Sequence, residues 1–170
     1  MELIDLVVNA ILFILPAYCA NAAPVIAGGG LPIDMGRNFL DGKPIFGKNK
    51  TIRGFFVGLV VGTAVGFAET FALKSPQYPI TFGPLLALGA LFGDLAGAFL
   101  KRRLGKPPGS LLPVIDQIDF IIGALLFSLL ITPPLRLSWE LVVTILLITP
   151  PIHLTTNFAA YKLGLKKNPW

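Results

Sequence analysis

Charged side chains are scarce in this chain of 170 residues, and only 14% of it is Asp, Glu, Lys or Arg. Soluble domains are about a quarter charged. Here 54% of the residues are hydrophobic and the mean hydropathy is +0.76. The composition therefore excludes an ordinary soluble domain and predicts one integral membrane domain over residues 1–170.

Cysteine is nearly absent as well. The single copy, Cys19, lies in an apolar run, so no intramolecular disulfide can form and no redox compartment can be inferred. The N-terminus lacks the basic residues of a secretory signal, because Glu2 and Asp5 stand in their place. We therefore expect the first apolar segment to be retained. The sequence shows no soluble linker and no repeat of domain size.

The positive charges are unevenly distributed. Twelve of the fourteen Lys and Arg residues fall in three polar stretches, 37–53, 101–106 and 162–167, and long apolar runs separate these stretches. If the runs cross a bilayer, the three stretches share one side, which the positive-inside rule assigns to the cytoplasm. The net charge of +5 is confined to such flanking loops, so we expect no nucleic-acid partner.

Five apolar runs are close to the length of about 20 residues that crosses the hydrocarbon core. They cover residues 3–27, 54–73, 80–100, 113–131 and 137–161. We therefore predict an all-α, multi-pass protein of the cell membrane with five transmembrane helices. Its N-terminus would lie outside and its C-terminus in the cytoplasm.

Glycine recurs at helical spacing in the second and third runs. The residues are Gly54, Gly58, Gly62 and Gly66, followed by Gly89, Gly93 and Gly97. A ridge of bare backbone lets a neighbouring helix approach closely. We expect these two helices to pack tightly together, which would place Asp94 in a protein-lined environment. The alternative is that glycine is simply common in membrane helices.

Three carboxylates lie within or beside the apolar runs near the basic side. Asp94 precedes Lys101 by seven residues, about 10 Å along a helix. Asp116 and Asp119 are three residues apart and share a helix face. An ionised carboxylate at such a depth needs a partner or a metal ion. We predict that all three bind Mg²⁺, while Asp116 and Asp119 alone would also suit a helix N-terminus.

Basic and small residues beside the carboxylates suggest a phosphate-binding site, with loops 28–53 and 101–112 forming it. A lysine-rich loop that opens a helix offers both cations and backbone amides to an anion. The predicted nucleotide-binding residues are Asn21, Lys43, Gly47, Lys48, Lys50, Thr51, Arg53 and Arg102, and Lys101 is predicted to be catalytic. Lys101 and Arg102 would receive either the leaving phosphates or the lipid phosphate. Basic loops that serve only to orient the protein are the alternative.

Two intramembrane polar residues in the fifth run, His153 and Asn157, are four apart and share a helix face. We predict that they make an interhelical hydrogen bond, with substrate contact as the second reading.

Several of these motifs resemble one known superfamily. Lys101-Arg102, then Lys106, then an Asp-x-x-Asp at Asp116 and Asp119 is similar to the phosphatidate cytidylyltransferase signature. The loop 46–54 (FGKNKTIRG), the segments 15–18 (LPAY) and 21–24 (NAAP), and the C-terminal stretch resemble its archaeal branch, the CDP-archaeol synthases, more closely. The resemblance extends over nearly the whole chain.

The resemblance implies an activity. Members of this branch transfer a cytidylyl group from CTP to the phosphate of an archaeal ether lipid of the 2,3-bis-O-geranylgeranylglycerol 1-phosphate type. The products are CDP-archaeol and pyrophosphate, and the reaction requires Mg²⁺. The implied partners are therefore CTP, a lipid phosphate and the bilayer, with the active site facing the cytoplasm.

Other classes of protein remain as alternatives. A small transporter or channel also buries carboxylates, although such proteins commonly contain inverted repeats, which this sequence does not show. A non-catalytic scaffold would tolerate neutral residues at the three aspartates. Among enzymes, a CDP-alcohol phosphotransferase would carry its aspartates in one segment.

Overall fold

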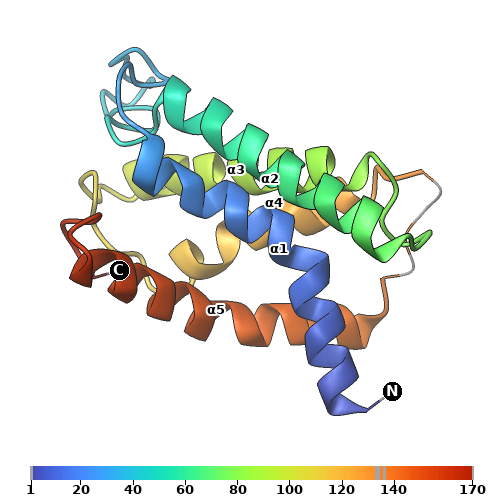
Figure 1. The fold of residues 1–170 in the computed structure, drawn as a ribbon. Helices are drawn as coiled ribbons and strands as arrows, with labels where there is room; N and C mark the ends of the chain where they lie inside the picture. Colours follow the sequence, from blue (N-terminus) through green and yellow to red (C-terminus); the bar gives the residue numbers. More distant parts are fainter. Residues whose placement is uncertain (1, 133–134, 136, 170) are drawn as a thin grey trace.

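The computed structural model describes residues 2–132, 135 and 137–169, and this part of the chain forms five α-helices and no strand. The helices are α1 (Leu3–Ala27), α2 (Ile52–Leu73), α3 (Phe82–Arg103), α4 (Ile115–Ser128) and α5 (Trp139–Lys162) (Figure 1). The all-helical prediction is confirmed.

Four of the helices, α1, α2, α3 and α5, are long and apolar enough to cross a membrane. The fourth predicted span is shorter than expected: α4 has 14 residues, about 21 Å at 1.5 Å per residue, against a hydrocarbon core of about 30 Å. Four candidate spans are thus present, and the fifth crossing stays a prediction.

The three basic stretches gather at one end of the bundle (Figure 1). The long α1–α2 loop, the α3–α4 loop and the end of α5 lie together there, and the N-terminus lies at the opposite end. This arrangement is the one that the charge pattern predicts for a single basic membrane face.

The core of the bundle is built where α1, α3 and α4 meet. Phe13 of α1 packs edge-on against Phe82 of α3 with ring centroids 5.4 Å apart, and both side chains are fully buried. Phe120 and Ile121 extend this core from α4. The packing holds α3 in the middle of the protein, so polar residues near its C-terminal end face protein on several sides.

The glycine seam of α2 packs against two helices. A Cβ atom added to Gly62 would lie within 2.8 Å of Ala20 of α1 and of Ala87 of α3. One turn further on, a Cβ on Gly66 would lie 2.1 Å from the Cα of Gly83. The predicted tight contact between α2 and α3 is therefore present, at Gly66 and Gly83.

The glycine seam of α3 faces a different helix from the one we expected. Gly89, Gly93 and Gly97 lie against α4. An added Cβ atom would lie 2.4 Å from the Gly123 carbonyl oxygen at Gly89, 2.2 Å from the Asp119 carbonyl oxygen at Gly93, and 1.9 Å from the Asp119 carboxylate at Gly97. The prediction that this seam meets α2 is wrong, because the spacing of glycines defines a face and not the neighbour that fills it. The consequence is that α4 lies unusually close to the face beside Asp94.

A buried carboxylate organises the α1–α2 loop. Asp34 accepts hydrogen bonds from the backbone N–H groups of Gly36 (3.0 Å), Phe46 (2.9 Å) and Gly47 (2.7 Å). Burial alone would raise the pKa of Asp34, yet these three donors outweigh it and hold the pKa below its ordinary value. At the end of the loop, buried Thr51 caps α2 by accepting from Gly54 at 3.1 Å.

The loop is also fastened to the basic end of α3. Arg103 pairs with Asp41, and the ammonium group of Lys43 donates to the carbonyl of Arg103 at 3.0 Å. A Cβ on Gly47 would lie 3.1 Å from Pro108, so the tip of this loop contacts the α3–α4 loop. The two loops that were predicted to share a site are therefore in direct contact.

The Gly66→Ala substitution should loosen the α2–α3 contact. The added methyl group meets backbone, which cannot yield as a side chain does, so we expect a loss of about 1–3 kcal/mol in unfolding free energy. The melting temperature in detergent measures it. Ala64→Val adds volume to an exposed site of the same helix and serves as the control. Equal melting of both variants and wild type would contradict the packing.

The Asp34→Asn substitution should release the α1–α2 loop, because the new amide N–H₂ group opposes the N–H donors of Phe46 and Gly47. We expect a lower melting temperature at neutral pH and faster tryptic cleavage after Arg37. Asp41→Asn, in the exposed part of the same loop, should have a smaller effect.

The stabilisation by Asp34 should depend on pH in one direction. Its folded pKa is lowered, so the contribution is complete above the unfolded value of about 3.9 and is lost as pH falls through the folded value. The gap in melting temperature between wild type and Asp34→Asn should therefore close in acid. A gap that widened below about pH 4 would contradict this sign.

Candidate active site

An ion pair joins the α1–α2 loop to the middle of the bundle. The ammonium group of Lys50 lies 2.6 Å from both carboxylate oxygens of Asp94 on α3. Both side chains are about three-quarters buried. The lysine neutralises a carboxylate that would otherwise be costly inside a membrane protein.

Asp119 reaches the same face of α3 from α4. A Cβ on Gly97 would lie 1.9 Å from its carboxylate, so only glycine at this position leaves room for the side chain. Its other oxygen accepts from the N–H of Phe120 at 2.6 Å. The charge of Asp119 lies within electrostatic reach of Asp94 and Lys50.

Asp116 pairs with Lys101 at 2.9 Å and is more deeply buried than Asp94. Its second oxygen accepts from the N–H of Leu112 at 3.0 Å, and the Gln117 side chain accepts from the N–H of Val114 at the same distance. These contacts shape the turn that starts α4. Asp116 thus stabilises a helix N-terminus and also lies in the polar site.

The helix α5 and the C-terminal segment also contribute polar side chains to this region. The Asn157 amide lies 3.1 Å from a ring nitrogen of His153 and accepts from the Lys166 ammonium at 2.8 Å. His153 and Asn157 share a face as predicted, but the hydrogen bond that they make joins them to one another within α5 and does not join two helices. Burial lowers the pKa of Lys166, and the nearby Lys50 lowers it further.

Together these side chains form what we call the polar cluster. Its members lie on the loop, three helices and the C-terminal segment, and they are near enough to interact through their charges. The polar cluster consists of Lys50, Asp94, Lys101, Asp116, Asp119, His153 and Lys166. The polar cluster therefore brings positive and negative side chains together at the basic end of the bundle.

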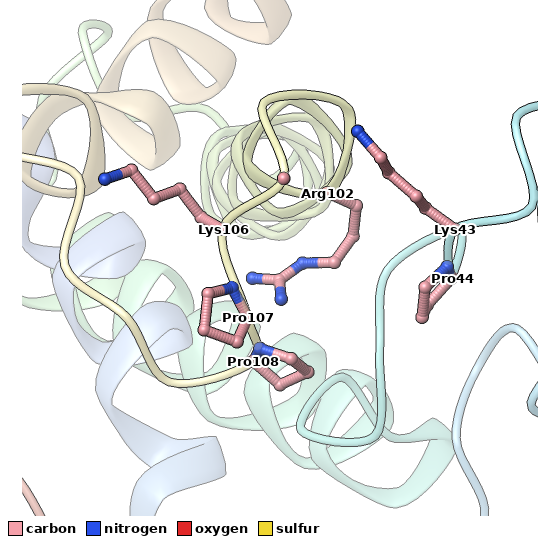
Figure 2. A pocket seen from close by; sticks show the side chains of 7 residues that line it. Lys43, Pro44, Arg102, Lys106, Pro107 and Pro108 are labelled. Carbon is pink, nitrogen blue, oxygen red and sulfur yellow. The ribbon is translucent and has the colours of Figure 1, made fainter.

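The remaining predicted nucleotide-binding residues take different positions. Lys48 and Arg53 are exposed at the basic end, and Asn21 is half-buried in α1. The hydroxyl of Thr51 accepts from two backbone N–H groups and so serves the loop. Arg102 is buried and lines a pocket together with Lys43 (Figure 2). Nucleotide binding by these residues stays a prediction.

An apolar pocket of about 230 Å³ lies between the loop, α2 and α3. It is lined by Ile33, Ile52, Phe55, Phe56, Phe92 and Leu95. Leu95 directly follows Asp94, and Ile52 follows Lys50 by two residues, so the pocket walls and the ion pair come from the same two stretches of chain. Phe56 is 59% exposed, so one wall of this pocket lies at the surface of the bundle.

The oxygen-rich donors of the polar cluster suit a hard divalent cation. Among the residues that the structure describes, no three His, Cys, Asp or Glu side chains are close enough to hold a metal ion by themselves. Magnesium, however, is commonly bound by one or two carboxylates with phosphate and water as further ligands. Asp94 and Asp119 fit that requirement, and ligation by all three aspartates stays a prediction.

Three residues that matter here were missed in the sequence. Asp34 could have been found as an Asp-x-Gly turn, because aspartate commonly accepts from the N–H two residues on. Gln117, which lies between Asp116 and Asp119 in the sequence, was not singled out, although its side chain accepts from the N–H of Val114 at the start of α4. Lys166 was read only as part of a basic stretch, and nothing local to the sequence indicates that its chain folds back over Asn157.

Comparison with known proteins gives a consistent result. The family model described as CarS-like CDP-archaeol synthase matches residues 3–170. Proteins named CDP-archaeol synthase include one from Pyrococcus furiosus, 46% identical over 96% of this chain and 98% of its own length. The protein of that name from Methanococcus aeolicus is 44% identical over the full length of both chains.

A solved structure of an intramembrane enzyme for archaeal membrane lipids biosynthesis has a TM-score of 0.82 and 39% identity, covering 89% of this chain and 94% of that one. This match favours the enzyme over the transporter and scaffold alternatives. The chain therefore belongs to the CDP-archaeol synthase family of membrane enzymes.

Proposed function

We propose that this protein transfers the cytidylyl group of CTP to the phosphate of an archaeal ether lipid and releases pyrophosphate. An oxygen of the lipid phosphate bonds to the α-phosphorus of CTP. The bond from that phosphorus to the oxygen bridging to the β-phosphorus breaks, and its electron pair leaves with pyrophosphate. Membership in the CDP-archaeol synthase family supports this reaction.

The observation that carries the proposal is that the polar cluster and the apolar pocket are built from the same stretches of chain. Lys50 and Asp94 form an ion pair, and their sequence neighbours Ile52 and Leu95 line the pocket. A reaction between a water-soluble nucleotide and a membrane lipid needs both kinds of surface. The lipid phosphate is already anionic, so the site must align two anions and neutralise them, and no general base is required.

The residues of the polar cluster would have two different roles in this reaction. Lys50, Lys101 and Lys166 supply positive charge from three separate segments. Asp94 and Asp119, with Asp116 beside them, would hold Mg²⁺. When bound, Mg²⁺ would neutralise phosphate oxygens and help to align them for in-line displacement. The ion pairs Lys50–Asp94 and Lys101–Asp116 keep these charges in place before substrate binds.

The lipid chain would enter from the side. The apolar pocket is open at Phe56 and lined on one wall by Phe55 and Phe92, whose ring centroids are 5.8 Å apart. An isoprenoid chain occupying it would bring the attached phosphate to Lys50. A substrate of the 2,3-bis-O-geranylgeranylglycerol 1-phosphate type would supply such a chain, of which one segment would occupy the pocket.

The basic end would face the cytoplasm, where CTP is made, and the N-terminus would lie outside. The uneven charge distribution supports this orientation. In the same arrangement α4, which contacts α1, α3 and α5, would provide the fifth crossing.

Replacement of either central carboxylate should abolish turnover. We expect Asp94→Asn and Asp119→Asn each to reduce cytidylyl transfer at least a hundredfold in a detergent assay with labelled CTP, Mg²⁺ and an ether-lipid phosphate. Glu69→Gln neutralises a buried carboxyl group of α2 outside the polar cluster and is the matched control. Near-normal turnover by Asp94→Asn would refute the assignment.

Filling the apolar pocket should impair lipid use alone. Ile33→Trp adds bulk from the loop wall, so we expect the KM for the lipid phosphate to rise several-fold while the KM for CTP is unchanged. Leu40→Trp, at a site of the same loop that is 96% exposed, should change neither. A rise in the KM for CTP with no change for the lipid would contradict this use of the pocket.

A further inference from the structure

A second pocket, separate from the apolar one, lies at the basic end between the two loops. Its volume is about 200 Å³, and it is lined by Lys43, Pro44, Arg102, Gly105, Lys106, Pro107 and Pro108. Figure 2 shows the Arg102 guanidinium lying between the Lys43–Pro44 segment and the chain that runs from Lys106 to Pro108. We call it the Arg102 pocket.

Arg102 differs from the two cations beside it in the sequence. Lys101 pairs with Asp116, and Arg103 pairs with Asp41. The Arg102 side chain is only 4% exposed, yet its Nε and Nη1 atoms have no hydrogen-bond acceptor within the described chain. Leaving buried charged donors unsatisfied is costly, so such a group in a native protein indicates a missing acceptor.

The surroundings of Arg102 select an anion with several charges. Lys43 and Lys106 line the same pocket, and no carboxylate is among its lining residues. Asp116 lies near enough to interact with Arg102, but it is already paired with Lys101. The planar guanidinium fork of Arg102 suits the oxygens of a phosphate group, and the two lysines that line the pocket add positive charge for an anion with several charges.

The walls limit the size of what can bind. Pro107 and Pro108 restrict the backbone on one side of the pocket. A Cβ atom added to Gly47 of the other loop would lie 3.1 Å from the Pro108 side chain, so the two loops are closely packed there. A volume of about 200 Å³ is below the range of about 300–1,000 Å³ that encloses whole small molecules. The pocket therefore fits a phosphate or diphosphate group and not a complete nucleotide.

We propose that the Arg102 pocket binds the diphosphate end of the nucleotide, the part that leaves as pyrophosphate. This inference rests on the proposed function, and it resolves the choice left open for the Lys101–Arg102 pair: Lys101 belongs to the polar cluster and Arg102 to a leaving-group pocket. The lipid phosphate is then held at Lys50 beside the apolar pocket, so the two anions approach from different sides.

The test is direct binding of pyrophosphate, without CTP, lipid or Mg²⁺, to the full-length protein in detergent by calorimetry. Arg102→Gln should weaken binding at least tenfold and Lys106→Gln several-fold. Lys167→Gln removes an exposed cation at the same end but outside the pocket, and it should bind as wild type does. Glycerol 1-phosphate, a soluble mimic of the lipid headgroup, should bind more weakly than pyrophosphate.

Several outcomes would overturn the proposal. These are wild-type pyrophosphate affinity in both Arg102→Gln and Lys106→Gln, or a preference for glycerol 1-phosphate that is lost with Arg102. A purely structural Arg102 would instead show a lowered melting temperature in Arg102→Gln without ligand, whereas removal of an unpaired buried charge should leave it equal or raised.

The Asp94→Asn variant separates this inference from the proposed function. It should lose turnover and still bind pyrophosphate as wild type does. Pyrophosphate binding by a wild-type protein that makes no CDP-lipid from CTP would refute the proposed function alone, and CDP-lipid formation by a wild-type protein that does not bind pyrophosphate would refute the pocket alone.

Discussion

The structure depends on the ion pair between Lys50 and Asp94. It joins a long polar loop to α3 in the interior of the bundle, together with the contacts that Asp41 and Lys43 make with Arg103. Asp94 is about three-quarters buried on a helix that packs against α1, α2 and α4, so the contacting lysine stabilises its charge. The rest of the polar cluster is arranged around this pair. Asp119 approaches from α4, and Lys166 approaches from the C-terminal segment.

Small residues make that arrangement possible. Gly93 and Gly97 allow α4 to lie against α3 so closely that the Asp119 carboxylate occupies the space of a missing side chain. On the other side, Gly66 and Gly83 bring α2 equally near. In a membrane, helix association relies on such close packing and on polar contacts, because lipid is as apolar as the side chains it surrounds. The same glycines therefore serve both stability and the placement of the site.

Much of this could be predicted from the sequence. Helix positions follow from apolar run length, and α1 ends where three glycines begin. The gathering of the basic loops and the buried aspartates at one end of the molecule was predictable, because charge is costly inside a membrane and needs a partner. The neighbour of each glycine seam was not predictable, since spacing defines only a face. The fold-back of Lys166 and the bonds to Asp34 from Phe46 and Gly47 were not predictable either, because they depend on how separate loop segments meet.

The central claim is that Lys50 and Asp94 stabilise one another. A double-mutant cycle of Lys50→Met, Asp94→Asn and the pair, with the free energy of unfolding measured in detergent, tests it most directly. Contacting charges of this kind show coupling energies of about 0.5–3 kcal/mol, so the double variant should be less destabilised than the sum of the single ones. Strictly additive effects would mean that the two side chains do not interact, and the account of the site built on them would be contradicted.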